Sequence, residues 1–279
     1  IYDEECNIWR TVIPIIASRG CPFPCYFCLN RVITKKYTIS PLELVINEIN
    51  AAIENYKNPL ITFWDPNFLI KEDLYMGILK YLKKKNIPFT FGTTVKQLLK
   101  NKKRIIEFKN LGLKTIEVGI ENVNDDVNRL ELGKVQKADE CWELVKILCD
   151  FEIECVADFI NYTAMSNLKH IKKNIEFLSY YNNITPLKEY YDFYRYESQL
   201  CYYVGSKSFD ILNDKINLEV VPTKIYYTED YFFDPQVKSL FICYKNFLSK
   251  EIKNIENFYM DRFKYYEKCN KLNDNKTIK

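Results

Sequence analysis

The first two hundred residues alternate short β-rich runs with stretches of helical period, and this alternation restricts the fold more than any other feature. The β-rich runs are residues 11–17, 60–64, 88–94, 115–121, 153–161 and 189–196. The amphipathic stretches between them are residues 41–56, 72–85, 95–110, 138–151 and 168–180. Such alternation is typical of parallel sheets with helical, right-handed crossovers. It predicts an α/β fold, a partial (β/α)6 TIM-like barrel, with functional residues at the carboxyl ends of the strands.

After residue 200 the alternation stops, and helical periodicity returns near the end of the chain. Apolar residues recur there at three- and four-residue steps, from Val237 to Phe263. This stripe predicts a long amphipathic helix that packs on the barrel. We therefore expect a barrel over residues 1–200 and a C-terminal helical extension over residues 201–279.

Composition excludes several classes of protein. An apolar content of 47%, with 15% aromatic residues, can fill a sizeable core in 279 residues. The net charge of +3, from 40 basic and 37 acidic residues, gives no indication of a nucleic-acid partner. The longest apolar runs, such as residues 12–17, are too short to span a bilayer. Ten cysteines without a targeting segment favour the reducing cytoplasm, and a single histidine, His170, leaves little for a histidine-based metal site.

Three cysteines, Cys21, Cys25 and Cys28, lie within eight residues in the loop after the first expected strand. A glycine and two prolines prevent this loop from becoming a helix. Because neighbouring thiolates repel one another unless a cation takes up their charge, the cluster predicts metal ligation. Closed zinc sites and ordinary iron–sulfur clusters need four ligands, and no fourth cysteine or histidine lies nearby. One metal position is therefore expected to be open.

The spacing Cys21-x-x-x-Cys25-x-x-Cys28, with Phe27 before the last cysteine, resembles the signature of the radical SAM enzymes. The resemblance covers residues 10–210 and implies a [4Fe-4S] cluster on the three cysteines, with S-adenosylmethionine (SAM) bound at the open iron and Phe27 beside it. It also implies an electron donor such as flavodoxin or ferredoxin. An electron from the reduced cluster would cleave SAM to methionine and a 5'-deoxyadenosyl radical, which takes hydrogen from an unactivated carbon.

Further segments are similar to the branch of this superfamily that includes methylthiotransferases and cobalamin-dependent proteins. Residues 19–22 resemble the start of that branch's cysteine loop. The resemblance implies that Asp65 meets the amino end of SAM, that Glu121 and Asn122 face its ribose, and that Lys134 meets its carboxylate. In cobalamin-dependent members a cobalamin-binding domain precedes the barrel. Because this chain starts where such a domain would end, either that domain was cut away or the protein works without cobalamin.

Each of these polar residues also has an ordinary structural interpretation. Asp65 could simply cap the turn that follows its strand. Lys134 lies in a charged stretch where a solvated face is the usual explanation. Glu121 is different, because a carboxylate at the end of an apolar strand is costly unless water or a ligand meets it. The sequence thus favours a functional role most strongly for Glu121.

The substrate is the least constrained part of the prediction. Residues 193–209 are faintly similar to radical SAM proteins that mature ribosomally made peptides, which favours a peptide side chain as substrate and methylation or another C–H modification as the reaction. Two alternatives stay open. One is a catalytically degenerate iron–sulfur scaffold, supported by an unusual turn at residues 161–166. The other is a zinc-binding structural module with a distant fourth ligand such as Cys6.

Overall fold

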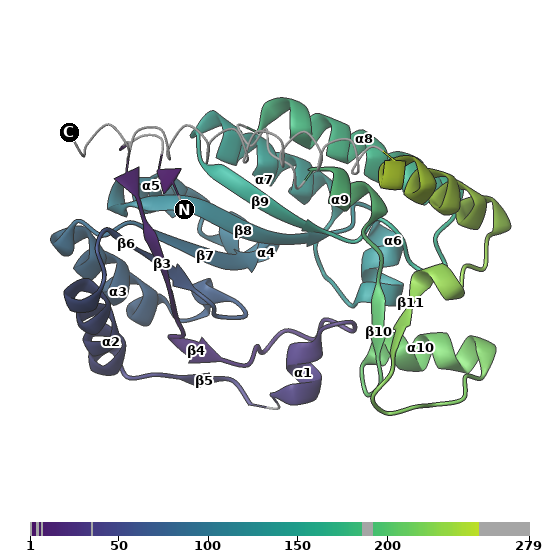
Figure 1. The fold of residues 1–279 in the computed structure, drawn as a ribbon, viewed down its shortest axis with the longest axis horizontal. Helices are drawn as coiled ribbons and strands as arrows, with labels where there is room; N and C mark the ends of the chain where they lie inside the picture. Colours follow the sequence, from purple (N-terminus) through teal and green to yellow (C-terminus); the bar gives the residue numbers. More distant parts are fainter. Residues whose placement is uncertain (1, 4–5, 7, 35, 186–191, 251–279) are drawn as a thin grey trace, which may run out of the picture.

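The computed structural model describes residues 2–3, 6, 8–34, 36–185 and 192–250 (Figure 1). Its centre is a parallel sheet of five strands in the order β3-β6-β7-β8-β9. The strands are β3 (Thr11–Ile15), β6 (Pro59–Phe63), β7 (Phe89–Thr94), β8 (Leu113–Glu121) and β9 (Glu154–Phe159). Five of the expected strands are thus found, and the open parallel sheet confirms the α/β barrel-type fold.

Helices connect successive strands and cover one face of the sheet (Figure 1). They are α2 (Leu42–Asn55), α3 (Glu72–Lys85), α4 (Val95–Lys100), α5 (Ile105–Leu111), α7 (Ala138–Asp150) and α8 (Leu168–Ile184), with short 3-10 turns η1 (Phe68–Ile70) and η2 (Lys102–Arg104). The expected helix over residues 95–110 is divided into α4 and α5 by η2. The other expected helices are confirmed within a few residues.

The main hydrophobic core lies between the sheet and these helices, and strand β7 shows how it forms. Phe89 and Phe91 are fully buried, whereas Thr90 on the opposite face is half-buried. The Phe91 ring packs 5.1 Å from that of Phe68, which stacks at 4.3 Å on Phe63. Burying a side chain of this size stabilises the fold by about 1.5–3 kcal/mol. The helix-covered face is therefore filled, and the other face of the sheet, called here the inner face, is left to line a site.

The sixth expected strand, residues 189–196, is wrong where the structure describes it. Residues 192–197 form a helix, α9 (Asp192–Glu197), and residues 189–191 lie outside the described part of the chain. The outer edge of β9 is instead capped by side chains. The Arg195 guanidinium donates to the carbonyl of Ala157 at 2.8 Å, and the Tyr181 hydroxyl accepts from the amide of Ala157 at 3.3 Å. A sixth strand is not needed to satisfy this edge.

The remaining elements lie outside the sheet (Figure 1). They are β1 (Tyr2–Asp3) paired with β2 (Ile8–Trp9), β4 (Ser18–Arg19) paired with β5 (Thr38–Ile39), α1 (Leu29–Ile33), α6 (Asp125–Val127), the π-helix η3 (Asn128–Leu132), β10 (Cys201–Tyr203) paired with β11 (Ile225–Tyr227), α10 (Lys207–Ile216) and η4 (Thr228–Asp230). In Figure 1, α1 with β4 and β5 lies along one outer edge, and α10 with β10 and β11 lies beside it.

A helix over residues 235–250 follows η4, as the apolar periodicity predicted. Val237, Phe241 and Leu248 are buried, and Phe241 packs edge-on at 4.9 Å against Tyr162. Phe247, which the stripe predicted to be in the core, is 56% exposed. The rest of the expected helix, residues 251–263, lies outside the described residues, and the division of the chain near residue 200 stays a prediction. In the described chain, no helix combines the length and apolarity that crossing a membrane requires.

Candidate functional site

The cysteine loop lies just beyond the carboxyl end of β3. It leaves β4 at Gly20 and ends where Cys28 immediately precedes α1. Cys21, Cys25 and Cys28 are all half-buried, free thiols. Because β4 pairs with β5, the loop and α1 are held at this end of the sheet.

Tyr26 fixes the middle of the cysteine loop against two distant parts of the chain. Its backbone amide donates to the carbonyl of Leu132 in η3 at 2.8 Å, and its carbonyl accepts from the amide of Ser208 in α10 at 3.1 Å. Its ring lies against Gly133, where φ is +63° and a Cβ would stand 2.2 Å from the ring. Only glycine fits this close approach without strain. The Lys207 ammonium lies 4.0 Å from the centroid of the same ring.

Phe27 belongs to a second apolar cluster that joins the cysteine loop to β10, α10 and β11. It is half-buried and packs in a group that includes Val127, Leu132 and Leu200. The sequence placed Phe27 beside SAM, and that role stays a prediction. The structure adds an anchoring contact, because this cluster holds the end of the loop in place.

Asp65 links the end of β6 to the beginning of the cysteine loop. One carboxylate oxygen accepts from the amide of Ala17 at 3.0 Å, and the other accepts from the hydroxyl of Ser18. Burial raises the pKa of Asp65, and these hydrogen bonds oppose that shift. Asp65 therefore does not merely cap its own turn, since it positions the chain that leads into the three cysteines.

Glu121 and Lys134 form a buried ion pair at the end of β8. Oε2 of Glu121 accepts from Nζ of Lys134, which also donates to the carbonyl of Gly119 at 2.7 Å. Glu121 has a positive φ of 55°, which turns the chain at this point, and both side chains are almost completely buried. Burial raises the pKa of Glu121, whereas the neighbouring ammonium lowers it. The solvated-face interpretation of Lys134 is therefore wrong, and the two residues that the sequence singled out separately are in contact.

This ion pair lies next to the cysteine loop, because Lys134 directly follows Gly133, which touches the Tyr26 ring. Burial raises the pKa of the Cys25 thiol to about 11, with smaller effects from charges nearby: Lys134 lowers it, and Glu121 and the other two thiols raise it. Without a cation the thiol is therefore neutral at physiological pH. Three free thiols with no local fourth ligand form the donor set that a [4Fe-4S] cluster with one open iron requires. The residues present fit that group.

Asn122, by contrast, is engaged in a buried network of amides. Its Nδ2 donates to the carbonyl of Ile160 at 2.8 Å, and its Oδ1 accepts from the backbone and side chain of Asn124. Asn124 also donates to Oδ1 of Asn174 at 2.9 Å. The network ties the turn after β8 to the end of β9 and to α8. The predicted contact of Asn122 with the ribose stays untested.

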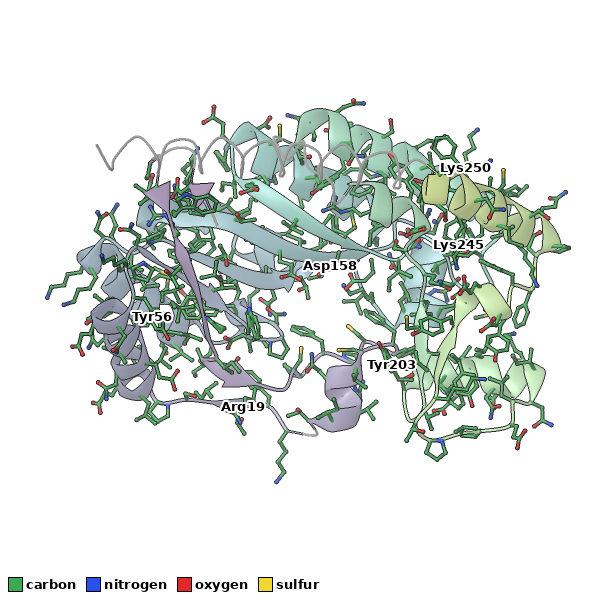
Figure 2. All side chains as sticks on the ribbon, in the orientation of Figure 1. Arg19, Tyr56, Asp158, Tyr203, Lys245 and Lys250 are labelled. Atoms are coloured by element: carbon green, nitrogen blue, oxygen red, sulfur yellow. The ribbon has the colours of Figure 1, made fainter. Side chains whose placement is uncertain are left out.

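Two carboxylates on the inner face were missed as site residues by the sequence. Glu117 on β8 and Asp158 on β9 occupy inner-face positions of adjacent strands, and Asp158 is labelled in Figure 2. Asp158 is exposed, although the surrounding atoms still partly desolvate its carboxyl group. This desolvation, followed by the charges of Glu117 and Glu121, raises the pKa of Asp158 to about 8. The signal in the sequence was a polar residue at alternate positions of an apolar strand, which is common in ordinary half-exposed strands.

A hollow of about 320 Å³ lies at the amino ends of β7, β8 and β9, at the end of the sheet opposite the cysteine loop. Cys6 lines it, together with Arg10, Lys83, Lys109 and Lys114. Cys6 therefore lies at the wrong end of the sheet to be the fourth ligand of a zinc site on the cysteine loop. Within the described ranges, no three Cys, His, Asp or Glu side chains converge as closely as a single metal ion requires. A four-iron cluster differs, because each thiolate binds its own iron.

Comparison with known proteins identifies residues 15–178 as a match to the Radical SAM superfamily. Bacteriochlorophyllide d C-12(1)-methyltransferase of Chlorobaculum tepidum is 26% identical over 122 residues, which are 43% of this chain and 26% of that protein. Anaerobic magnesium-protoporphyrin IX monomethyl ester cyclase of Rubrivivax gelatinosus is 26% identical over 156 residues, which are 54% of this chain and 27% of that protein.

Among solved structures, the cobalamin-dependent S-adenosylmethionine radical enzyme OxsB, with aqua-cobalamin and S-adenosylmethionine bound, is similar with a TM-score of 0.57. The identity is 15%, and the match covers 75% of this chain and 36% of OxsB. At this identity the likeness shows the fold, a partial barrel. The chain spans 26% and 27% of the two curated relatives.

Proposed function

Since the chain belongs to the radical SAM superfamily of enzymes, as the spacing of its cysteines predicted, we propose that Cys21, Cys25 and Cys28 hold one [4Fe-4S] cluster and that SAM binds beside it. When bound, the cluster supplies the electron for reductive cleavage of SAM. The observation that carries this proposal is the placement of three free thiols opposite the buried Glu121–Lys134 pair.

Glu121 and Lys134 are suited to bind the polar groups of SAM. Lys134 is a buried cation whose charge acts on the Cys25 thiol, so its ammonium is well placed for the carboxylate of SAM. Glu121 uses one oxygen for Lys134 and keeps lone pairs for the ribose hydroxyls. Because both groups are removed from water, each interaction with the cofactor is stronger than it would be on the surface.

The other predicted cofactor residues are proposed to orient the site. Asp65 fixes the start of the cysteine loop through Ala17 and Ser18, and its remaining lone pairs are available to the ammonium of SAM. Asn122 holds the turn that presents Glu121, because its own amide is engaged with the carbonyl of Ile160. Phe27 supports the loop from its apolar side and excludes water there.

The reaction that we propose is modification of a C–H bond, with methylation as the favoured product. Methylation is supported by the relatives of this chain, which include two bacteriochlorophyllide d methyltransferases of Chlorobaculum tepidum. A peptide side chain stays the proposed substrate on the resemblance of residues 193–209. A requirement for cobalamin is proposed only for a longer protein, because the part of OxsB matched here is 36% of its length.

Anaerobic reconstitution tests the proposal directly. The full chain is loaded with iron and sulfide, reduced with methyl viologen and given SAM, and 5'-deoxyadenosine and S-adenosylhomocysteine are measured. We expect both iron binding and SAM cleavage to depend on Cys21, Cys25 and Cys28, and to be lost in the triple alanine variant. The matched control replaces Cys6, Cys201 and Cys243, which lie outside the cysteine loop, with alanine.

The outcome also separates the alternatives. Equal SAM cleavage in both triple variants would contradict the proposed cluster site. An intact cluster that binds no SAM in calorimetry would favour the degenerate scaffold. Zinc bound without sulfide would favour a structural module.

A further inference from the structure

Reductive cleavage of SAM consumes one electron, so a protein that works in this way needs an external electron donor. This inference rests on the proposed function and asks where such a donor would dock. A donor has to approach the cysteine loop from outside, because the sheet and its helices enclose the other side. The outer edge formed by β4, β5 and α1 is the part of the surface next to that loop (Figure 1).

The sequence around the cysteine loop carries charge of one sign. Residues 6–42 contain five arginines and lysines and neither an aspartate nor a glutamate. The chain as a whole is nearly balanced, with 40 basic and 37 acidic residues, so this segment differs from the rest. Positive charge is therefore concentrated in the segment that carries the three thiols, and no acidic residue of the segment offsets it.

Three of these cations and two apolar side chains lie along the edge formed by β4, β5 and α1, which we call the α1 face: Arg19, Leu29, Arg31, Ile33 and Lys36. All five are exposed, Ile33 by 71% and Leu29 by 38%, and Arg19 is labelled at this edge in Figure 2. Among the described residues, no ion pair engages the three cations. An apolar centre with a charged rim is the usual composition of a protein interface.

The α1 face is also close to the thiols. Cys28 directly precedes α1, and Ile33 lies five residues further, about 7.5 Å along the helix axis. The backbone amide of Arg31 donates to the carbonyl of Cys28 at 3.2 Å, so Arg31 lies next to the cysteine loop as well. A protein seated on this face would therefore bring a redox group near the cysteine loop.

We propose that the α1 face is the docking surface for a small acidic electron-transfer protein. Arg19, Arg31 and Lys36 attract and orient its acidic surface, and Leu29 and Ile33 form the apolar contact. In the step that follows, the reduced donor loses one electron, which passes to the cluster held by the cysteine loop, and no proton or group is transferred. Opposite charges of this kind raise association rates by about 10- to 1000-fold at low ionic strength.

Binding is tested first without any cluster. Oxidised flavodoxin, an acidic donor, is titrated onto the metal-free full chain at about 20 mM salt and again at about 200 mM salt. The test variant is Arg19→Glu, Arg31→Glu and Lys36→Glu combined. Its matched control is Lys83→Glu, Lys84→Glu and Lys85→Glu, which reverses three exposed cations on α3. We expect at least ~10-fold weaker binding for the α1-face variant and little change for the control.

Reduction of the reconstituted protein then separates the two proposals. Reduced methyl viologen, a small cation, is expected to drive SAM cleavage equally in the wild type and the α1-face variant, whereas reduced flavodoxin is expected to drive it at least ~10-fold more slowly in the variant. If viologen works and flavodoxin serves both proteins equally, the docking surface is wrong and the proposed function stands. If neither reductant gives SAM cleavage in the wild type, the proposed function itself fails. Binding of flavodoxin that is weakened equally by the α3 control would also overturn the docking surface.

Discussion

Two lysine–glutamate ion pairs at opposite ends of the parallel sheet differ in their exposure to water. At the amino end, the hollow of about 320 Å³ is lined by cations such as Lys109, whose ion pair with Glu152 is largely exposed to water. At the carboxyl end, the Glu121–Lys134 pair is almost completely buried. The hollow thus lies beside a solvated ion pair, and the three thiols lie at the end that holds the desolvated one.

The difference shows that buried polarity marks a site better than empty volume does. A solvated ion pair contributes little and constrains little. A desolvated pair is expensive to keep, so a fold that keeps one beside three thiols gains something other than stability from it. At the carboxyl end, burial raises the pKa of several groups, among them Cys25, Asp65, Glu121 and Glu131.

The largest loss of stability is expected when the buried cation, Lys134, is replaced. Lys134→Met leaves Glu121 buried without its partner, and loss of one member of a buried pair costs about 3–5 kcal/mol. We expect a fall of that size in the free energy of unfolding, measured by urea denaturation of the metal-free chain. The double variant Lys134→Met with Glu121→Gln should recover part of it, because no charge is then left unpaired. Equal stability of the single variant and the wild type would show that the pair is not desolvated in solution.

A second buried group at the carboxyl end, Glu131, is expected to make the stability of the fold depend on pH. This carboxyl group in η3 is 5% exposed, and its Oε2 has no hydrogen-bond partner in the described chain. Burial raises its pKa to about 7. The folded protein therefore holds this proton more tightly than the unfolded chain, so the group stabilises the fold less as the pH rises from about 4.5 through 7. The total loss is about 3 kcal/mol at pH 8 relative to pH 4.

Glu131→Gln should remove this part of the pH dependence. Urea unfolding of both proteins at several pH values between 5 and 8 measures the difference between their stabilities. We expect the glutamine variant to gain on the wild type by about 2–3 kcal/mol across that range. Parallel pH profiles would mean that Glu131 ionises with its ordinary pKa.

The smallest effect is expected at the amino end. Lys109→Met removes the exposed ion pair with Glu152, which measures 3.2 Å, and a hydrogen bond to the carbonyl of Phe151. The expected cost is about 1 kcal/mol or less. Denaturation under the same conditions as for Lys134→Met gives a direct comparison. A cost as large as that of Lys134→Met would erase the distinction between the two ends.

The sequence predicted the parts of the site that depend on local spacing. The three cysteines lie within one loop, and Glu121 is conspicuous at the end of an apolar strand. Lys134 was ambiguous because its burial depends on η3 and on a partner 13 residues away. Asp158 could not be identified, because its proximity to Glu117 depends on the pairing of β8 with β9.

The fold was likewise predictable where it depends on local sequence patterns. Regular alternation specified five strands and the helices between them, since each buries its own apolar face. The error at residues 189–196 arose because an aromatic run favours a strand. Tertiary contacts decide otherwise, since Arg195 is buried, donates to Ala157 and lies 5.2 Å from the ring of Tyr181.

The central claim is that the cysteine loop holds a cluster with one iron open to SAM, opposite Glu121 and Lys134. Electron paramagnetic resonance of the reconstituted, reduced full chain, recorded before and after addition of SAM, tests it most directly. We predict a cluster signal that SAM changes in the wild type and that is absent when Cys21, Cys25 and Cys28 are alanine. A cluster signal that survives in the triple variant, or one that saturating SAM leaves unchanged, would contradict the claim.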